Sequence, residues 1–325
     1  MNPLQWESIV ERIDKNSELT RKSFEKLESK KVLVACSGGA DSVALAIMFK
    51  ASGLDFGLAY IDHGINPETQ SSEVVVKELG SICDVPFFSC YLDMAEKELV
   101  DSNLEATARE KRYSALEEMR TIHGYDLIAT AHHLDDFAET FLINLIRGSG
   151  SGGASLAESR NNLIRPILHW RKTELIELVR ACQISHHEDM MNSDPRFVRN
   201  RVRNEAIPLL SDIAGRDVAP LLARAARNIS GDTNYLQKLA ASIWPKDTAT
   251  TNDLNGLDPI LQVHALREWI QGYPPSTEEM DRILSVVRHE IVSTQISGNR
   301  TIRRSGAVLY QDVTSTKTNT NKESK

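Results

Sequence analysis

The sequence contains no hydrophobic run long enough to cross a lipid bilayer, which takes about 18 to 20 consecutive apolar residues. Its first residues, Met-Asn-Pro-Leu-Gln-Trp-Glu, lack the basic stretch followed by an apolar one that is typical of a secretory signal. Only four of the 325 residues are cysteine, and no two of them form a C-x-x-C pair. Neither a disulfide framework nor a zinc or iron–sulfur site is indicated. We therefore expect a cytoplasmic protein with reduced cysteines and no membrane contact.

Positive charge is also scarce, since 38 Lys and Arg residues face 45 Asp and Glu residues and the formal net charge is −7. A general nucleic-acid binder is usually basic, so a surface for nucleic acid would have to be local. A chain of 325 residues exceeds the usual size of one hydrophobic core. Breakers at Gly215 and Pro220 predict two domains, residues 1–215 and 216–312, followed by a polar, disordered tail at 313–325.

Short apolar runs alternate with helical patterns through the first half of the chain. Strands are predicted at 31–36, 55–61, 86–91 and 126–131, and helices at 42–51, 69–83, 103–122, from 134 onward and at 171–183. This alternation is typical of an α/β fold with a doubly wound, mainly parallel sheet. The smaller C-terminal domain is predicted to be mostly helical, with a capping box at Ser276 and a hairpin over 300–312 that turns at Ser305-Gly306.

A small-residue turn at 37–42, Ser-Gly-Gly-Ala-Asp-Ser, stands between the first predicted strand and the next helix. Glycines let a backbone approach a phosphate closely, and the first amides of a helix attract an anion. It is no Walker A loop, because no Lys-Ser or Lys-Thr follows the glycines. The alternative, a Gly-Gly turn merely capped by Asp41, leaves the rest of the chain unexplained. The turn therefore predicts phosphate binding.

Further polar residues follow the other predicted strands, and ligands bind beyond the carboxyl ends of such strands. Asp62 and His63 follow the second strand, and His132 follows the strand that ends at Ala131. Three acids lie within one helical turn just after it, namely Asp135, Asp136 and Glu139. They could simply complement the helix dipole, but three carboxylates beside a phosphate loop also predict Mg²⁺ and a cationic substrate group. Of His132 and His133, one is predicted to contact a nucleotide or base and the other to pack in the core.

Arginine is concentrated in one segment of this acidic chain. Residues 196–203 hold four arginines and no lysine or glutamate, which predicts contact with phosphates of RNA or of a nucleotide. Arg109 and Arg112 lie three apart on a predicted helix and can bind phosphate or carboxylate as forks. A solvated helix face is the alternative for this pair.

Together these segments resemble the tRNA(Ile)-lysidine synthase family of the pyrophosphate-loop ATPase group. The resemblance spans about residues 30–210. Its matching segments are Ser37–Ser42, Asp62-His63-Gly64, Ala108-Arg109 with Arg112-Tyr113, Ala131–Thr140, Arg147–Gly150, Arg165–Leu168, Glu188-Asp189 followed by Asn192, and Phe197-x-Arg199-Asn200-x-x-Arg203. It implies an adenine nucleotide alpha hydrolase-like fold. It also implies ATP and Mg²⁺ as cofactors, and free lysine and an isoleucine tRNA with a CAU anticodon as partners, and it allows a homodimer.

The resemblance implies that O2 of the wobble cytidine attacks the α-phosphate of ATP, and that the lysine ε-amine then attacks C2 and expels AMP. The catalytic residues it implies are Asp41, Asp136, Glu139 and Arg112. ATP would contact Ser37, Gly38, Gly39, Ala40, Asp41, Ser42, Asp62, His63 and His132. Lysine or tRNA would contact Arg109, Lys172, Arg199, Asn200 and Arg203, and Mg²⁺ would bind Asp41 and Asp135.

Three other functions remain open at this point. A tRNA thiolation enzyme would also adenylate a base, but it needs reactive or cluster-binding cysteines. A module that binds ATP or RNA without catalysis would release no pyrophosphate. A small-molecule amidotransferase such as an NAD or GMP synthetase would not explain the arginine segment.

Overall fold

The computed structural model describes residues 11, 18–62, 69–92, 104–148, 159–187, 197–244, 249–270 and 275–313. The chain forms two compact units, residues 1–143 with 156–224 and residues 144–155 with 225–325. The division near residue 224 falls inside one helix, α10 (Ala219–Ile243), nine residues after the predicted boundary at 215. None of the helices in the described ranges has the length and apolar character that a membrane span requires. The predicted disordered tail lies, apart from its first residue, outside the described residues.

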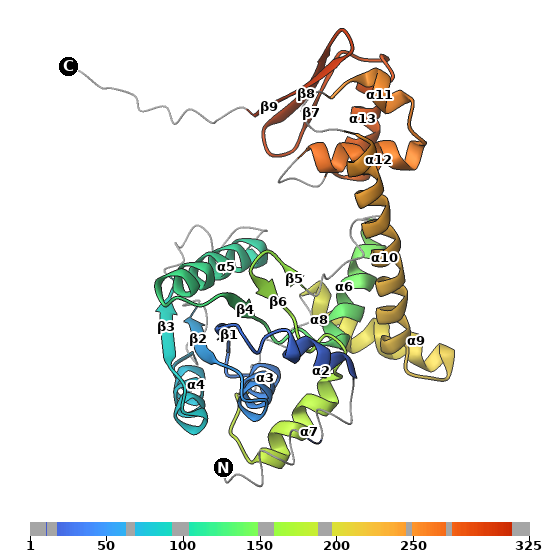
Figure 1. The fold of residues 1–325 in the computed structure, drawn as a ribbon. Helices are drawn as coiled ribbons and strands as arrows, with labels where there is room; N and C mark the ends of the chain where they lie inside the picture. Colours follow the sequence, from blue (N-terminus) through green and yellow to red (C-terminus); the bar gives the residue numbers. More distant parts are fainter. Residues whose placement is uncertain are drawn as a thin grey trace, which may run out of the picture. The chain divides into compact units, whose positions relative to one another are not determined.

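The first unit is built on a six-stranded sheet in the order β3-β2-β1-β4-β6-β5 (Figure 1). All neighbouring strands are parallel except the edge pair of β5 and β6. The predicted doubly wound, mainly parallel sheet is therefore confirmed. The strands are β1 (Val32–Ala35), β2 (Phe56–Asp62), β3 (Phe87–Tyr91), β4 (Leu127–Ala129), β5 (Ser159–Arg160) and β6 (Leu163–Ile164).

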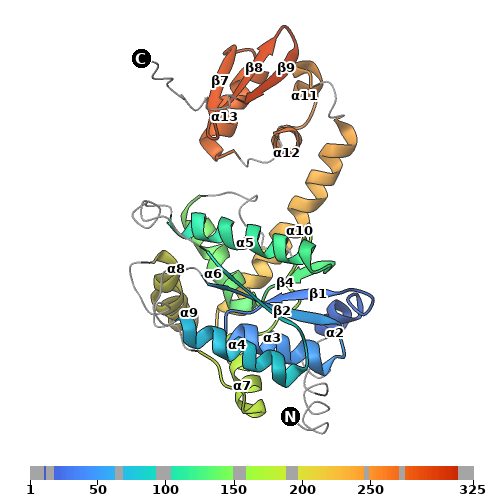
Figure 2. The ribbon, with the colours of Figure 1, turned by 90° about the vertical axis from the view of Figure 1, so that its left-hand side faces the viewer.

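Two helical layers cover this sheet, as Figure 2 shows. Along β1 the side chains alternate between them: Val32 and Val34 pack with α2, α3, α4 and α7, whereas Leu33 packs with α5. Because both faces are covered, β1 is apolar on both sides. The helices are α2 (Glu18–Glu25), α3 (Ala40–Ala51), α4 (Thr69–Cys83), α5 (Leu104–Ile122), α6 (Leu134–Ile146) and α7 (Lys172–Cys182).

The helix that carries the arginine-rich segment is continuous but irregular. It consists of α8 (Val198–Arg201), a π-helical turn η3 (Val202–Ala206) and α9 (Ile207–Ala214). A π-helical turn widens the backbone by one residue and often occurs at functional sites. No hydrophobic period in the sequence would reveal such a turn.

The second unit has its own core, formed by helices and a small antiparallel sheet in the order β7-β8-β9. The predicted capping box is present, since Ser276 Oγ accepts from the Glu279 amide and the Glu279 carboxylate accepts from the Ser276 amide. The predicted hairpin also forms, with Gly306 at φ 59°. The elements are α11 (Thr251–Asn255), α12 (Pro259–Trp269), α13 (Thr277–Val287), β7 (Ser293–Ile296), β8 (Arg300–Ser305) and β9 (Val308–Val313). Only β7 has no counterpart in the prediction.

Candidate active site

The turn after β1 is shaped by a glycine that no other residue could replace without strain. Gly38 has φ +83°, and a Cβ added to it would lie 3.0 Å from the backbone oxygen of Ser72. Gly39, next in the chain, is the N-cap of α3. The amides of the first turn of α3 have no acceptor within the helix. The turn thus presents backbone N–H groups and a helix N-terminus, which together attract a phosphate.

Ser42 braces this turn from inside. Its hydroxyl accepts from the Ser37 amide at 3.2 Å and donates to the Gly39 carbonyl at 2.9 Å. The amide of His187 donates to the Gly38 carbonyl at 2.8 Å. Since its side chain is directed at the turn itself and is buried, Ser42 holds the shape of the turn.

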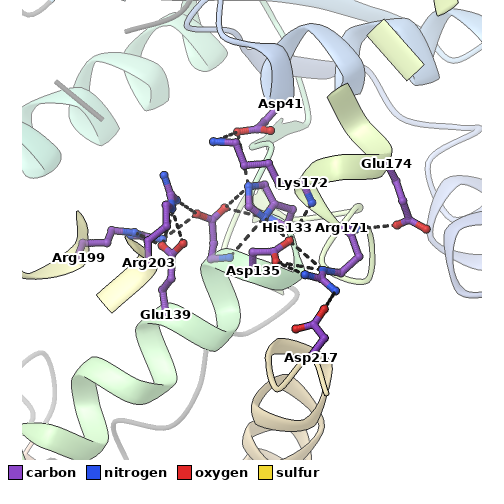
Figure 3. Close-up of polar contacts among 11 residues, drawn as sticks. Asp41, His133, Asp135, Glu139, Arg171, Lys172, Glu174, Arg199, Arg203 and Asp217 are labelled. Atoms are coloured by element: carbon purple, nitrogen blue, oxygen red, sulfur yellow. Dashed lines mark hydrogen bonds and ion pairs between the residues drawn. The ribbon is translucent and has the colours of Figure 1, made fainter. Parts of the chain in front are cut away.

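Asp41, in the first turn of α3, points at a histidine just before α6 and a lysine at the start of α7 (Figure 3). Its Oδ2 atom lies 3.5 Å from His133 Nε2 and 4.0 Å from Lys172 Nζ. Its Oδ1 atom is buried and has no hydrogen-bond donor among the described residues. One oxygen of Asp41 thus lies near two basic side chains, and the other has no hydrogen-bond donor among the described residues.

His133 is the residue that brings the phosphate loop and the acidic helix together. It immediately precedes α6, its amide donates to Asp136 Oδ2 at 3.0 Å, and its Nδ1 accepts from the Asp136 amide at 3.4 Å. Nε2 then faces Asp41. Burial alone would lower the pKa of His133, but the hydrogen bond to Asp41 and the charges of Asp136, Asp41 and Asp135 raise it above its usual value.

Asp136 and Glu139 are enclosed by two arginines of the arginine-rich segment. Arg199 donates from Nε to Glu139 at 2.8 Å and from a terminal nitrogen to Asp136 at 2.8 Å. Arg203 donates from Nε to Glu139 at 2.6 Å. Burial would raise the pKa of Asp136, but His133 and Arg199 lower it to about 2. Arg201 points elsewhere and pairs with Glu205 at 3.0 Å. In this structure the predicted phosphate-binding residues Arg199 and Arg203 therefore face the acids.

Asp135 forms an ion pair with a third arginine, Arg171, which lies at the start of α7 (Figure 3). Arg171 donates to it from Nε at 3.0 Å and from a terminal nitrogen at 2.8 Å, and the Lys172 amide donates at 2.8 Å. Burial raises the pKa of Asp135, but these bonds outweigh it and lower the pKa below its usual value. The proposal that Asp135 binds Mg²⁺ stays a prediction, since its carboxylate is engaged by protein donors here.

The remaining predicted residues lie on neighbouring elements. His132 accepts or donates through Nδ1 with the Thr130 hydroxyl at 2.8 Å, and burial lowers its pKa to about 3. Arg109 and Arg112 both lie over the ring of Tyr113, with guanidinium carbons 5.1 and 5.7 Å from its centroid. Asp62 is the last residue of β2, and Asn200 is buried in α8. His63 lies outside the described residues.

Sequence reasoning missed the roles of His133 and Arg171 in this arrangement. Their signal is indirect. Three carboxylates that gather in a partly buried place need basic partners. The histidines and arginines of the chain are therefore candidate partners for these acids. The helix start at residue 171 was predicted, but nothing in the sequence shows that its first side chain turns toward Asp135.

Comparison with known proteins identifies the family of this chain. A model of the PP-loop domain family matches residues 13–210. A tRNA(Ile)-lysidine synthase of Salinispora arenicola is 31% identical over 304 residues, which cover 86% of this chain and 90% of that protein. One of Actinobacillus succinogenes is 30% identical over 307 residues, covering 88% of this chain and 70% of that protein.

Other relatives match over part of their length. The alignment covers 66% of this chain and 64% of a tRNA(Ile)-lysidine synthase of Nostoc sp., at 33% identity. Among solved structures, a U34-tRNA thiolase of Methanococcus maripaludis has a TM-score of 0.56 at 19% identity, covering 68% of this chain and 80% of that one, which supports the fold alone. The match of a PP-loop model to most of the first unit, with two relatives aligned over most of both chains, shows that this chain belongs to the PP-loop domain family and, within it, to the tRNA(Ile)-lysidine synthases.

Proposed function

We propose that this chain joins free lysine to C2 of the wobble cytidine in the CAU anticodon of an isoleucine tRNA, using ATP and releasing AMP and pyrophosphate. The observation that carries the proposal is the contact of Asp41 in the phosphate loop with His133 at the start of the acidic helix. That contact puts a phosphate site next to carboxylates able to bind an amine. The names of the aligned relatives support the substrate class.

For the first step, the turn at 37–42 would hold the phosphates of ATP through its backbone amides. Asp41 Oδ1, buried and without a donor among the described residues, fits a Mg²⁺ ligand. Mg²⁺ commonly takes one or two protein carboxylates and completes its shell with water and substrate phosphates, so a single ready oxygen suffices. When bound, Mg²⁺ would neutralise the charge of the leaving pyrophosphate. Lys172 Nζ, close to the other oxygen of Asp41, would add positive charge beside the phosphates.

For the second step, Asp136 and Glu139 would bind the lysine ammonium and accept its proton. Glu139 is only 1% exposed and is already neutralised by Arg199 and Arg203. An incoming ammonium must therefore share these carboxylates with the arginines or displace a guanidinium. Because a carboxylate has about four acceptor positions, sharing requires no loss of the existing pairs. Arg199 and Arg203 would then set the charge of the amine site.

The other predicted residues surround these two sites. We assign His132, together with Asp62 and His63, to the nucleotide. A ring whose pKa is about 3 is neutral near pH 7 and can hydrogen-bond a base without carrying charge. Arg112 would be a catalytic residue that binds the lysine carboxylate or a tRNA phosphate. Arg109 and Asn200 would contact lysine or tRNA.

The second unit is assigned to tRNA contact. Arg300, Arg303 and Arg304 lie together on β8, so this strand concentrates positive charge within an acidic chain. We thus assign catalysis to the predicted domain over 1–215 and tRNA contact to the predicted domain over 216–312.

Thiolation finds no support in the described cysteines. None of the four forms a disulfide among the described residues; Cys36 directly follows β1, Cys83 and Cys182 end α4 and α7, and Cys90 lies within β3. Burial raises the pKa of Cys36 and raises that of Cys83 to about 12, so both thiols stay protonated and are poor nucleophiles.

The test is an omission experiment with the purified chain. It is incubated with ATP, Mg²⁺, lysine and total tRNA, and the nucleosides are then analysed by mass. Lysidine is expected only when all components are present, and pyrophosphate release is expected with tRNA even without lysine. A thiolated nucleoside, or release of pyrophosphate without tRNA, would overturn the proposal. No pyrophosphate release at all would leave a binding module.

A further inference from the structure

The side chain of Arg171 bridges two carboxylates, and the proposed chemistry gives it no role. Its Nε and one terminal nitrogen donate to Asp135, and its other terminal nitrogen pairs with Asp217. A guanidinium can do this because its donors lie in one plane and point in different directions. A lysine ammonium carries the same charge but lacks this fork.

The backbone that carries Arg171 is fixed on both sides. Its amide donates to Glu174 at 2.7 Å, closing the capping box of α7. The preceding carbonyl, that of Trp170, accepts from the Leu134 amide at 2.9 Å, which ties the segment to the first residue of α6. Trp170 itself is buried, and its indole donates to Thr20 at 2.9 Å. The guanidinium therefore projects from a rigid support.

On one side this bridge reaches the catalytic residues. Asp135 also accepts from the Lys172 amide at 2.8 Å, and its Oδ2 lies 3.7 Å from His133 Nδ1. The Lys172 ammonium in turn lies 4.0 Å from Asp41 Oδ2. A shift of Arg171 would therefore be felt by both Asp135 and the phosphate loop.

On the other side the bridge reaches the start of α10. Asp217 Oδ1 accepts from the Ala219 amide at 3.0 Å, so Asp217 caps the helix that begins there. Figure 1 shows α10 as one unbroken helix. Its residues up to Arg224 belong to the first unit, and those from Ala225 belong to the second. One carboxylate thus contacts both the Arg171 guanidinium and the first amide of the helix that leads into the second unit.

We propose that Arg171 is a positioning residue: by tying Asp135 at the start of α6 to Asp217 at the start of α10, it holds Lys172 beside Asp41 for the first step. This inference rests on the proposed function. It requires that loss of the Arg171–Asp217 contact slow the chemistry without weakening tRNA binding.

The test compares Asp217→Asn, Arg171→Lys and the double variant in the full chain. Pyrophosphate release is measured with saturating ATP and tRNA and without lysine, and tRNA affinity is measured separately. We expect each single variant to lower kcat about fivefold or more with the tRNA Kd unchanged, because the bridge positions groups of the first step. The double variant should be no slower than Arg171→Lys alone, because both changes break one connection.

Asp212→Asn is the matched control, since Asp212 is an exposed acid on α9 with no ion pair among the described residues. Asp217 is 49% exposed, so its replacement should change the melting temperature by no more than about 4 °C.

The inference is overturned if Asp217→Asn behaves like Asp212→Asn, if the two single effects multiply in the double variant, or if the loss appears in tRNA affinity. Should Arg171→Lys fail to fold, the two aspartate variants still decide. Failure of the proposed function would look different, because the unchanged protein would then release no pyrophosphate with tRNA.

Discussion

Arg199 and Arg201 stand two residues apart on one helical segment and have opposite environments. Arg199 is 29% exposed and pairs with Asp136 and with buried Glu139, whereas Arg201 is 62% exposed and pairs with Glu205 four residues on. Removing one partner of a buried pair leaves the other charge uncompensated. We predict that Arg199→Gln lowers the free energy of unfolding by about 2–3 kcal/mol.

Arg201→Gln is the control for this prediction, and it should leave the urea unfolding curve unchanged because exposed helix pairs contribute little. Equal urea unfolding curves for the two variants would mean that Arg199 contributes no more to stability than the exposed Arg201 does. Loss of tRNA affinity in Arg201→Gln without loss of stability would place phosphate contact on the exposed side of the segment.

Asp41 offers a second prediction at the scale of one residue. Its Oδ1 atom is buried without a donor among the described residues, and its other oxygen lies near His133 and Lys172. Asp41→Ala should lower tRNA-dependent pyrophosphate release without lysine by about 100-fold or more, the size seen when an electrostatic contact to a developing charge is lost. Asp55→Asn, an exposed acid before β2, is the control. Release near the normal rate in Asp41→Ala would remove this carboxylate from the first step.

The pKa of His132 predicts how stability depends on pH. Burial lowers this pKa from 6.5 to about 3, so between these values the unfolded chain binds a proton that the folded protein does not. The neutral ring makes its full contribution to the free energy of unfolding above pH 6.5. As the pH falls below this value, the free energy of unfolding decreases by up to about 1.4 kcal/mol per pH unit. His133, whose pKa is raised, makes its full contribution below 6.5 and adds no slope there.

His132→Asn should therefore show a shallower fall in the free energy of unfolding between pH 6.5 and 4 than the unchanged protein does. Urea unfolding at four or five pH values in this window provides the measurement. Parallel curves for the two proteins would show that the imidazole titrates alike in the folded and unfolded states.

At the scale of elements, the shape of the phosphate turn depends on Gly38, and Gly53 offers a matched control for its substitution. Gly38 and Gly53 both have positive φ, +83° and +68°. A Cβ at Gly38 would meet the Ser72 carbonyl at 3.0 Å, whereas one at Gly53 would meet nothing within 4 Å. Both alanine substitutions should cost about 1–2 kcal/mol for the left-handed backbone. Only Gly38→Ala should also raise the KM for ATP, because only there must the turn move.

Pyrophosphate release at several ATP concentrations, together with urea unfolding, separates the two effects. An unchanged KM in Gly38→Ala would mean that the turn tolerates the added methyl group and that its shape is not needed for ATP.

The elements that sequence patterns predict here are the ones fixed by local chemistry. β1 and α3 follow from a buried apolar run and a glycine turn, and the capping box at Ser276 follows from residue spacing. β5 and β6, with two residues each, are too short to show a period, and the π-helical turn η3 has no signal in residue type. The acids of α6 were found as a group, but their partners Arg171, Arg199 and Arg203 come from elements 36 to 67 residues away. Which cation meets which acid is decided by tertiary packing.

At the scale of the whole molecule, the net charge of −7 means that tRNA must be attracted locally. Three arginines lie on β8, but they are not equivalent. Arg303 pairs with Asp312 at 2.6 Å and lies over the Tyr310 ring, so its charge is already balanced. Arg300 and Arg304 make no ion pair among the described residues. Among the three, only Arg300 and Arg304 should each neutralise a tRNA phosphate with a full positive charge and so release the counterions bound to it.

We predict that Arg300→Gln and Arg304→Gln each reduce the slope of log affinity against log salt by about 0.7–0.9, and that Arg303→Gln reduces it less. The measurement is a tRNA titration at four salt concentrations from low to physiological. Arg201→Gln serves as the comparison in the first unit, because its exposed guanidinium also carries a salt-bridged charge. If the slope falls for Arg201→Gln and stays unchanged for both β8 variants, phosphate contact belongs to the arginine-rich segment of the first unit. The second unit would then need another role.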